Sequence, residues 1–423
     1  MRRHKTPNPL NRSHPAVHVP LVLLSLLFMV PFIWLSCSSL EPREQVGKVP
    51  PEWLPRQHTL TLPSGEKLKV TPPERVGADK LLVEPREGPL AGQRLLVEPE
   101  RIREGALERE VLQGDQFVKE RVPVTLVERV PARHVIVREW FLSKYREREP
   151  RTFYVPPESV RTRIAPLWDN YPEAVRALTA SEQERALPLG ELVGKSALPW
   201  TPKSDPNHTI TFVTYLANTL TVAVLGVLGT VLSSALVAYG LSRVRFRGRE
   251  ALFTLTLATM MIPFPVLMIP LYAVFRELGW IGTLLPLWVP AFFGGAFNIF
   301  LLRQFFLTIP SELSDAARID GCSELGIFFR VVLPLARPAL AVVALFHFLY
   351  VWNDFLAPLI FLTEPETFTM ALGLQQYQSH HGGSEWQLLL AASVLLVLPV
   401  VLLFFLAQRT FIQGISTTGM GGR

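Results

Sequence analysis

The chain has 423 residues, 49% of them hydrophobic, and a formal net charge of +6 at pH 7. Most acidic residues fall between 41 and 200, whereas 209–423 is nearly all apolar with arginines in short patches. This distribution indicates membrane orientation rather than nucleic-acid binding. The two cysteines, Cys37 and Cys322, are too few and too far apart for a disulfide framework or a cysteine metal cluster.

Six apolar runs are long enough to cross a bilayer, which takes about 20 mostly apolar residues. In chain order they are residues 19–40, 212–241, 251–275, 282–302, 339–362 and 388–407. The first run could instead be a lipoprotein signal cleaved before Cys37, but Trp34 fits poorly at the third position before that cysteine. We therefore expect an all-α membrane protein with six transmembrane helices.

Arginine and lysine in the short loops set the orientation. Basic residues occur before the first run, after the second at 243–249, between the fourth and fifth, and again at Arg409. All of these loops fall on one side of a six-span chain, so both termini are predicted to be cytoplasmic. The predicted regions are a cytoplasmic segment 1–18, helix 19–40, an extracytoplasmic segment 41–208, a core 209–408 and a cytoplasmic tail 409–423.

The extracytoplasmic segment carries strand signals. "LLVEP" occurs at 81–85 and again at 95–99, and alternating runs such as 66–70, 123–130 and 133–140 are typical of strands. The sequence predicts a small β-rich insert. Its content of Glu, Arg and Pro leaves disorder as the alternative.

Two features inside the core predict its packing. Pro263, Pro265 and Pro270 each remove a backbone donor and should kink the third span. In the second span, small residues should allow a neighbouring helix to approach closely. These small residues are Gly226, Gly229, Ser233 and Ser234.

A polar stretch, residues 311–338, separates the fourth and fifth spans. Ser311 is expected to be the N-cap of a helix that stops at Gly321, with Leu313, Ala316, Ala317 and Asp320 on one face. Ser323 is expected to cap a second short helix, which ends before Pro334 and Pro338. Its predicted buried face comprises Leu325, Phe328, Phe329 and Val332. The alternative interpretation is an ordinary loop helix at the membrane interface, and composition alone would favour it.

The spacing within this stretch is more specific than its composition. An acidic residue and two alanines (315–317) are followed after three residues by Gly321, and Val331 and Leu333-Pro334 come nine residues later. This pattern resembles the EAA loop of bacterial ABC-importer permeases, with Asp315 in place of glutamate and Val331 in place of isoleucine. The segments 218–250, 260–272 and 351–362 resemble the carbohydrate-uptake branch of that family, and the likeness covers the first span and about 205–415.

The resemblance implies a transport subunit rather than an enzyme, with no catalytic residue, metal or cofactor of its own. ATP and Mg²⁺ would bind a partner ATPase dimer, on which the loop 304–337 would dock. The other implied partners are a second permease, an extracytoplasmic solute-binding protein, the lipid of a bacterial or archaeal cytoplasmic membrane, and a sugar or polyol as solute. The implied coupling residues are Asp315, Ala316, Ala317, Arg318, Asp320, Gly321, Leu333 and Pro334. The tail lacks the family's usual ending, which weakens the inference of a second ATPase contact.

Other chemistry in the chain is sparse. "GELVGKS" at 190–196 is one residue short of a phosphate-binding loop. Trp352, Asn353 and Asp354, near His347, are candidates for the translocation path, since charge at membrane depth faces a cavity or a partner. Helix-to-helix hydrogen bonding is the alternative role for these residues. Alternative functions are import of another solute such as glycerol phosphate, ion-coupled secondary transport, and a membrane-anchored external binding module.

Overall fold

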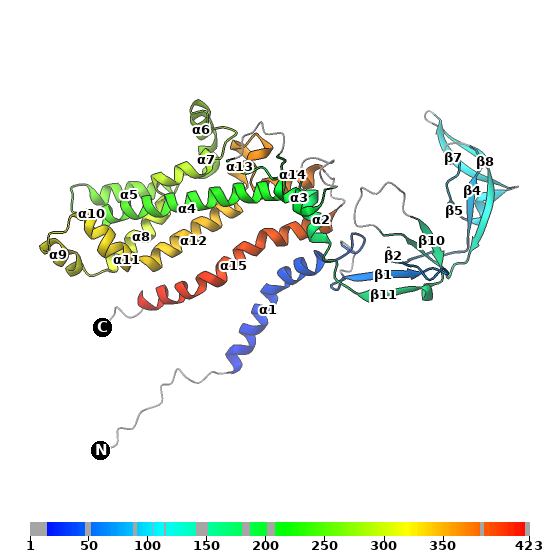
Figure 1. Cartoon of the computed structure of the whole chain (residues 1–423), viewed down its shortest axis with the longest axis horizontal. Coiled ribbons are helices and arrows are strands. Elements are labelled where there is room, and N and C mark those ends of the chain that lie inside the picture. The colour runs from blue at the N-terminus through cyan, green and yellow to red at the C-terminus, as the bar shows by residue number, and fades with distance from the viewer. Residues whose placement is uncertain are drawn as a thin grey trace, which may run out of the picture. The chain divides into compact units, whose positions relative to one another are not determined.

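The computed structural model describes residues 15–46, 52–87, 91–103, 105–113, 116–140, 151–179, 187–200, 208–380 and 385–418. Most of the predicted segment 1–18 and the end of the tail 409–423 lie outside these residues. The chain divides into two compact units, Met1–Glu173 and Ala174–Arg423 (Figure 1).

The first unit begins with an apolar helix, α1 (Pro15–Ser38). Its large apolar side chains from Val19 to Trp34 are exposed, as expected for a surface that lipid or another helix covers. The chain just after α1 is tied to the far end of the insert. Asn170 donates from Nδ2 to the carbonyl oxygens of Ser39 (2.8 Å) and Glu41 (2.9 Å). These bonds bring the two ends of the insert together.

Strands build the insert. They are β1 (Arg56–Thr61), β2 (Lys67–Val70), β3 (Glu74–Arg75), β4 (Lys80–Pro85), β5 (Leu95–Val97), β6 (Ile102–Arg103), β7 (Ala106–Gln113), β8 (Gln116–Val130), β9 (Val135–Arg138), β10 (Thr152–Val155) and β11 (Val160–Ile164). Two 3₁₀ turns, η2 (Pro99–Arg101) and η3 (Pro157–Ser159), precede β6 and β11.

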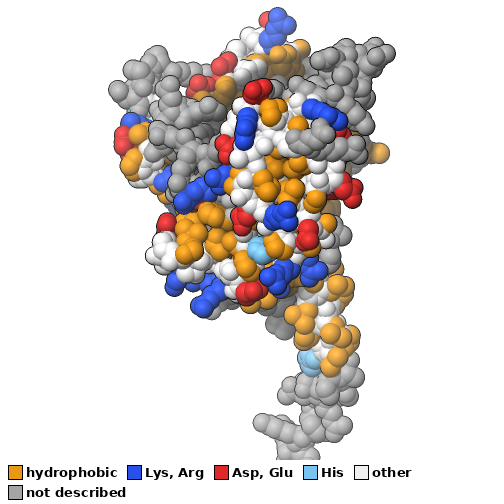
Figure 2. Space-filling model, turned by 90° about the vertical axis from the view of Figure 1, so that its right-hand side faces the viewer, with side chains coloured by type: hydrophobic (Ala, Val, Ile, Leu, Met, Phe, Trp, Pro, Cys, Tyr) orange, Lys and Arg blue, Asp and Glu red, His pale blue; other side chains and the backbone are white. Residues whose placement is uncertain are grey.

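The strands form three antiparallel sheets, ordered β11-β1-β2, β10-β9-β3 and β5-β4-β8-β7-β6. The two copies of "LLVEP" pair with each other, because Leu81 lies opposite Val97 and Val83 opposite Leu95. Each core is small: Leu60, Val70, Val135 and Val137 form one of them. In Figure 2, which views the molecule from the right-hand side of Figure 1, apolar side chains gather in the middle of the face with charged side chains around them.

The second unit is helical. Its helices are α3 (Leu189–Gly194), α4 (Phe212–Arg243), α5 (Arg249–Thr259), α6 (Phe264–Glu277), α7 (Leu285–Trp288), α8 (Ala296–Thr308), α9 (Ser311–Ile319), α10 (Glu324–Ile327), α11 (Leu333–Leu335), α12 (Arg337–Asn353), α13 (Leu356–Phe361), α14 (Met370–His380) and α15 (Trp386–Thr418). Helix α2 (Asn170–Ala177) crosses the unit boundary. Single turns η5 (Val289–Phe293) and η7 (Pro365–Thr367) and a π-helical turn η6 (Phe328–Val332) complete it.

Helix α4 is central, and α8 and α12 pack against it (Figure 1). The predicted close packing of its small residues is confirmed. A Cβ on Gly229 would lie 2.4 Å from a ring carbon of Phe292, and one on Gly226 would lie 2.9 Å from Nε2 of His347. Ser233 donates to the carbonyl oxygen of Ala291 (2.9 Å). Neighbouring segments therefore approach the α4 backbone in a way that larger side chains would prevent.

Within the residues that the structure describes, four helices are long and apolar enough to cross a membrane, or up to six if each of two bent pairs counts as one span. The first pair is α5 and α6, which meet at 97° beside Pro263, so the predicted kink is confirmed at this proline. Pro265 and Pro270 instead lie within α6. The second pair joins 324–335 to α12 at 80°, and Pro338 lies in the first turn of α12. Helix α12 ends at Asn353, so the predicted span 339–362 is too long, and α13 follows as a separate short helix.

Candidate functional site

The loop between α8 and α12 begins with α9. The structure corrects the predicted cap: Pro310 is the N-cap residue and no side chain caps the helix, so Ser311 already belongs to its first turn. The backbone of Pro310 is extended, with a ψ of 134°, so the first helical residue is Ser311. The predicted end is confirmed, because Gly321 has φ +82° and its N–H bonds the carbonyl of Arg318 (3.0 Å).

The chain itself buries little of helix α9. Of the four residues expected on one face, Ala317 is buried, and Ser314 is buried beside it. Leu313, Ala316 and Asp320 are exposed, and the side chain of Ile319 is 87% exposed. The outward face of α9 therefore combines apolar and acidic groups that the chain itself leaves uncovered.

Helix α10 follows with its predicted cap. Ser323 accepts at Oγ from the N–H of Gly326 (3.2 Å). Phe328 and Val332 are buried as expected, but Leu325 and Phe329 are 60% and 57% exposed, so half of the predicted buried face is wrong. The π-helical turn η6 explains the difference, because its wider turn changes the regular helical spacing on which the prediction rested.

Charged side chains fix this loop to α4. Arg318 donates to Asp315 (2.7 Å) and to Oε1 of Glu324 (2.8 Å), and Tyr239 of α4 donates its hydroxyl to Oε2 of Glu324 (2.7 Å). The hydrogen bond from Arg318, followed by that from Tyr239, lowers the pKa of Glu324 below its ordinary value. Neither Tyr239 nor Glu324 was among the predicted site residues. The remaining predicted pair, Leu333-Pro334, begins α11.

Two arginines join α4 and α8 reciprocally. Arg243, the last residue of α4, donates to the carbonyl oxygens of Phe306 and Ile309 at the end of α8. Arg303 of α8 donates to the carbonyl of Leu241 (3.0 Å) and to both carboxylate oxygens of Glu250 (2.9 Å each). Its guanidinium also lies 3.9 Å from the ring centre of Phe253. Each arginine thus caps carbonyl groups on the partner helix.

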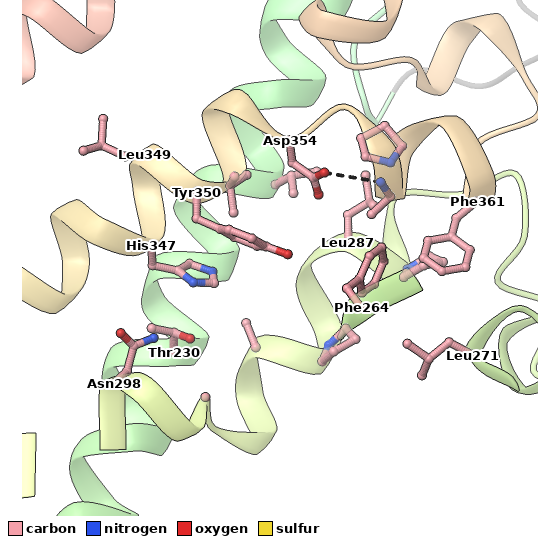
Figure 3. A pocket seen from close by; sticks show the side chains of 18 of the residues that line it. Thr230, Phe264, Leu271, Leu287, Asn298, His347, Leu349, Tyr350, Asp354 and Phe361 are labelled. Atoms are coloured by element: carbon pink, nitrogen blue, oxygen red, sulfur yellow. Dashed lines mark hydrogen bonds between the residues drawn. The ribbon is translucent and has the colours of Figure 1, made fainter. Parts of the chain in front are cut away.

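A cavity of about 760 Å³ lies between α4, the α6–α8 segment and the end of α12 (Figure 3). Its polar groups are few and come from Thr230, Asn298, His347, Tyr350, Asp354 and Thr369. Aromatic rings contribute much of the remaining lining, from Phe264, Phe275, Phe297, Phe346 and Phe361. No lysine or arginine is among the lining residues. A cavity of this size with aromatic walls and a few polar groups suits a small organic solute.

The three predicted path residues separate here. Asp354 lines the cavity, with Oδ1 accepting from the N–H of Ala357 (3.3 Å). Trp352 is only 2% exposed and donates to the carbonyl of Leu396 in α15 (3.0 Å), so it has a packing role. Asn353 is exposed and bonds its own helix at Leu349 (2.8 Å). Within the described part of the chain, no three His, Cys, Asp or Glu side chains gather to hold a metal ion.

Comparison with known proteins identifies a family and several relatives of the chain. The family described as "binding-protein-dependent transport system inner membrane component" matches residues 227–417. An arabinooligosaccharides transport system permease of Halalkalibacterium halodurans is 39% identical over 49% of this chain and 74% of its own length. A trehalose/maltose transport system permease of Thermococcus litoralis is 33% identical over 52% and 78%. A sn-glycerol-3-phosphate transport system permease of Pectobacterium atrosepticum is 35% identical over 49% and 74%.

The family match, residues 227–417, lies within the helical unit and includes α9. The likeness to the three relatives covers more than two thirds of each relative's length. The apolar helices and the helical architecture agree with this likeness to membrane transport proteins. The chain belongs to the family of binding-protein-dependent transport system inner membrane components and is a multi-pass membrane permease of the ABC-importer type.

Proposed function

We propose that α9 is the coupling helix of this permease and docks on a cytoplasmic ATPase subunit, where ATP and Mg²⁺ bind. The observation that supports this most strongly is the exposure of Leu313, Ala316 and Ile319 on α9. The chain on either side of α9 is bonded to α4, through Arg243 and Ile309 before the helix and through Tyr239 and Glu324 after it. A rigidly held helix with an uncovered, partly apolar face is suited to receive force from a partner. The docking residues would be Asp315, Ala316, Ala317, Arg318, Asp320, Gly321, Leu333 and Pro334.

The proposed topology has six spans, formed by α1, α4, the bent pair α5–α6, α7–α8, α12 and α15, and both termini are cytoplasmic. The helical segment 324–335, bent away from α12, stays on the cytoplasmic side. The arginines at 243–249 and those of the loop 304–337 then share the cytoplasmic side. The β-rich insert within 41–208 would face outward in a bacterial or archaeal cytoplasmic membrane. There it would be available to the extracytoplasmic solute-binding protein.

A second permease subunit would complete the cavity. Phe297, Phe346 and Tyr350 line it and remain substantially exposed in this chain. Exposed aromatic side chains around a solute-sized cavity favour closure by a homologous subunit rather than by lipid. The assembly would comprise two permeases, two ATPase subunits and the solute-binding protein.

The proposed solute is a mono- or oligosaccharide or a polyol. Relatives named for arabinooligosaccharide and trehalose/maltose transport support this class. The cavity supports it too, because aromatic faces and uncharged polar groups suit a polyhydroxy compound. Glycerol phosphate, favoured by one relative's name, is the second candidate. A lining that includes Asp354 and no basic side chain disfavours an anion.

The test is purification of the tagged protein from its native membranes and identification of the proteins that accompany it. An Ala316→Trp variant should lose the ATPase, because a bulky ring would occupy the docking face. The control is Ala251→Trp, the same change at an exposed position at the start of α5. Retention of the ATPase by Ala316→Trp, or absence of any ATPase from the unmodified protein, would contradict the proposal.

A further inference from the structure

The start of α9 is attached to α4 through Arg243. This arginine donates to the carbonyl of Ile309, two residues before α9 begins, and to Phe306 within α8. The attachment fixes the position of the N-terminal end of α9. It does not fix the direction of the helix, which could still pivot about that point.

The end of α9 is attached to α4 through Tyr239, one turn before Arg243. The buried Tyr239 hydroxyl donates to Oε2 of Glu324 (2.7 Å), and Oε1 of Glu324 accepts from Arg318 in the last turn of α9 (2.8 Å). The Tyr239 ring also packs on Phe328, with ring centres 5.1 Å apart. Hydrogen bonds to a carboxylate are stronger and more directional than ring packing. The hydroxyl therefore holds α9 at its second point.

The same helix borders the cavity at residues that precede Tyr239 in the chain. Val222 and Thr230 of α4 line the cavity, Gly229 lies against Phe292, and Ser233 bonds the carbonyl of Ala291. These close contacts leave little space for the cavity wall to move independently of α4. A rotation of α4 at its Tyr239 end would therefore move the wall.

We infer that Tyr239 is a positioning residue for coupling: its hydroxyl, through Glu324 and Arg318, prevents α9 from pivoting and so transmits displacement of α9 along α4 to the cavity wall. The inference rests on the proposed docking of α9 on an ATPase. It assigns to one hydroxyl group a role in transmission that is separate from docking, because Tyr239 is buried and lies behind the exposed face of α9.

The experiment uses the complex purified with its ATPase and a reporter on the cavity wall. Cys37→Ser and Cys322→Ala remove the native thiols, and Thr230→Cys places a single thiol at the cavity. The rate at which N-ethylmaleimide modifies this thiol is measured with and without Mg²⁺ and a non-hydrolysable ATP analogue. The test variant is Tyr239→Phe, and the matched control is Thr221→Val, which removes an α4 hydroxyl that bonds only its own helix at Ala217.

Tyr239→Phe should keep the ATPase bound but reduce the nucleotide-dependent change in modification rate about fivefold. Thr221→Val should retain that change. Glu324→Gln should reproduce the Tyr239→Phe loss, and the double variant should be no worse than either single one, because both changes break one link. A purely structural role would instead lower thermal stability and give additive losses.

An unchanged nucleotide response in Tyr239→Phe, or additive losses in the double variant, would overturn the inference while leaving the proposed function in place. A reporter that does not respond to nucleotide in the unmodified complex would overturn it as well. Failure of the proposed function is a separate observation, since then no ATPase would accompany the unmodified chain in the first place.

Discussion

Helix α4 is held in two different ways along its length. Around Gly226 and Gly229 the rings of His347 and Phe292 approach the helix backbone closely, because glycine leaves space for them. Around Tyr239 and Arg243 the contacts are directional bonds to a carboxylate and to carbonyl groups. Close packing resists any change of volume, whereas directional bonds resist rotation. The comparison suggests that the middle of α4 maintains the bundle and its end controls the attached loop.

The largest expected effect concerns the middle of α4. Gly229→Ala would place a methyl group 2.4 Å from a ring carbon of Phe292, and this ring is packed against the helix. Overpacking of this kind costs about 1–3 kcal/mol. Thermal unfolding of the purified protein in detergent should show a clearly lower midpoint.

Gly240→Ala is the matched control for this prediction. It makes the same change in the same helix, but no atom lies within 4 Å of the new methyl group. Since alanine is favoured over glycine in a helix by about 0.5–1 kcal/mol, the midpoint should stay or rise. Equal destabilisation by the two substitutions would show that close packing does not distinguish the middle of α4 from its end.

The next effect concerns the reciprocal arginines. Arg303 is 8% exposed and makes three hydrogen bonds, so Arg303→Met should destabilise the protein by about 2 kcal/mol. Arg303→Lys should recover only part of this, because Nε of Arg303 bonds the Leu241 carbonyl while Nη2 bonds the Glu250 carboxylate, and a single ammonium group cannot occupy both positions. Exposed Arg330→Met is the control and should change stability by less than about 0.5 kcal/mol. A lysine variant as stable as the original would show that the simultaneous contacts with Leu241 and Glu250 do not matter for stability.

Several of these features follow from the sequence and several do not. Hydropathy locates the long helices, prolines locate the break before α6, and small residues locate the close packing on α4, because each depends on local chain properties. The contacts of Tyr239 with Glu324 and of Arg303 with Leu241 join residues 85 and 62 positions apart. No local pattern encodes such pairs. The predicted buried face of the helix after Ser323 is half wrong at Leu325 and Phe329, since a regular helical period does not include the π-helical turn.

The candidate path residues illustrate the same limit. Trp352 and Asp354 are two residues apart, yet one packs on α15 and the other lines the cavity. The end of α12 at Asn353 separates their directions, and the apolar run continued past that point. Composition could indicate that this stretch is polar at membrane depth but could not assign the two roles.

A third prediction separates these two residues. Trp352→Phe keeps a ring beside Phe348 but loses the bond to Leu396, and should lower stability by about 1 kcal/mol without altering solute selection. Asp354→Asn should nearly retain stability. It should instead change the rates at which reconstituted vesicles take up different sugars and polyols relative to one another. Altered selection in Trp352→Phe with none in Asp354→Asn would reverse the assignment of the two residues.

The smallest expected effect is the pH dependence of the bond that holds α9. Glu324 lies in the loop before the fifth proposed span, and its folded-state pKa is below its ordinary value because Arg318 and Tyr239 donate to it. A carboxyl group of this kind contributes stability above its unfolded pKa of about 4.3 and loses it as the pH falls through the lower folded value. The midpoint difference between the original protein and Glu324→Gln should therefore be constant from about pH 6 to 8 and shrink below about pH 4. Both Arg318 and Glu324 are partly exposed, so the difference should also decrease with added salt. A difference that grew on acidification would mean that Glu324 is held in its protonated form, and the directional bonding that distinguishes this end of α4 would have to be reassigned.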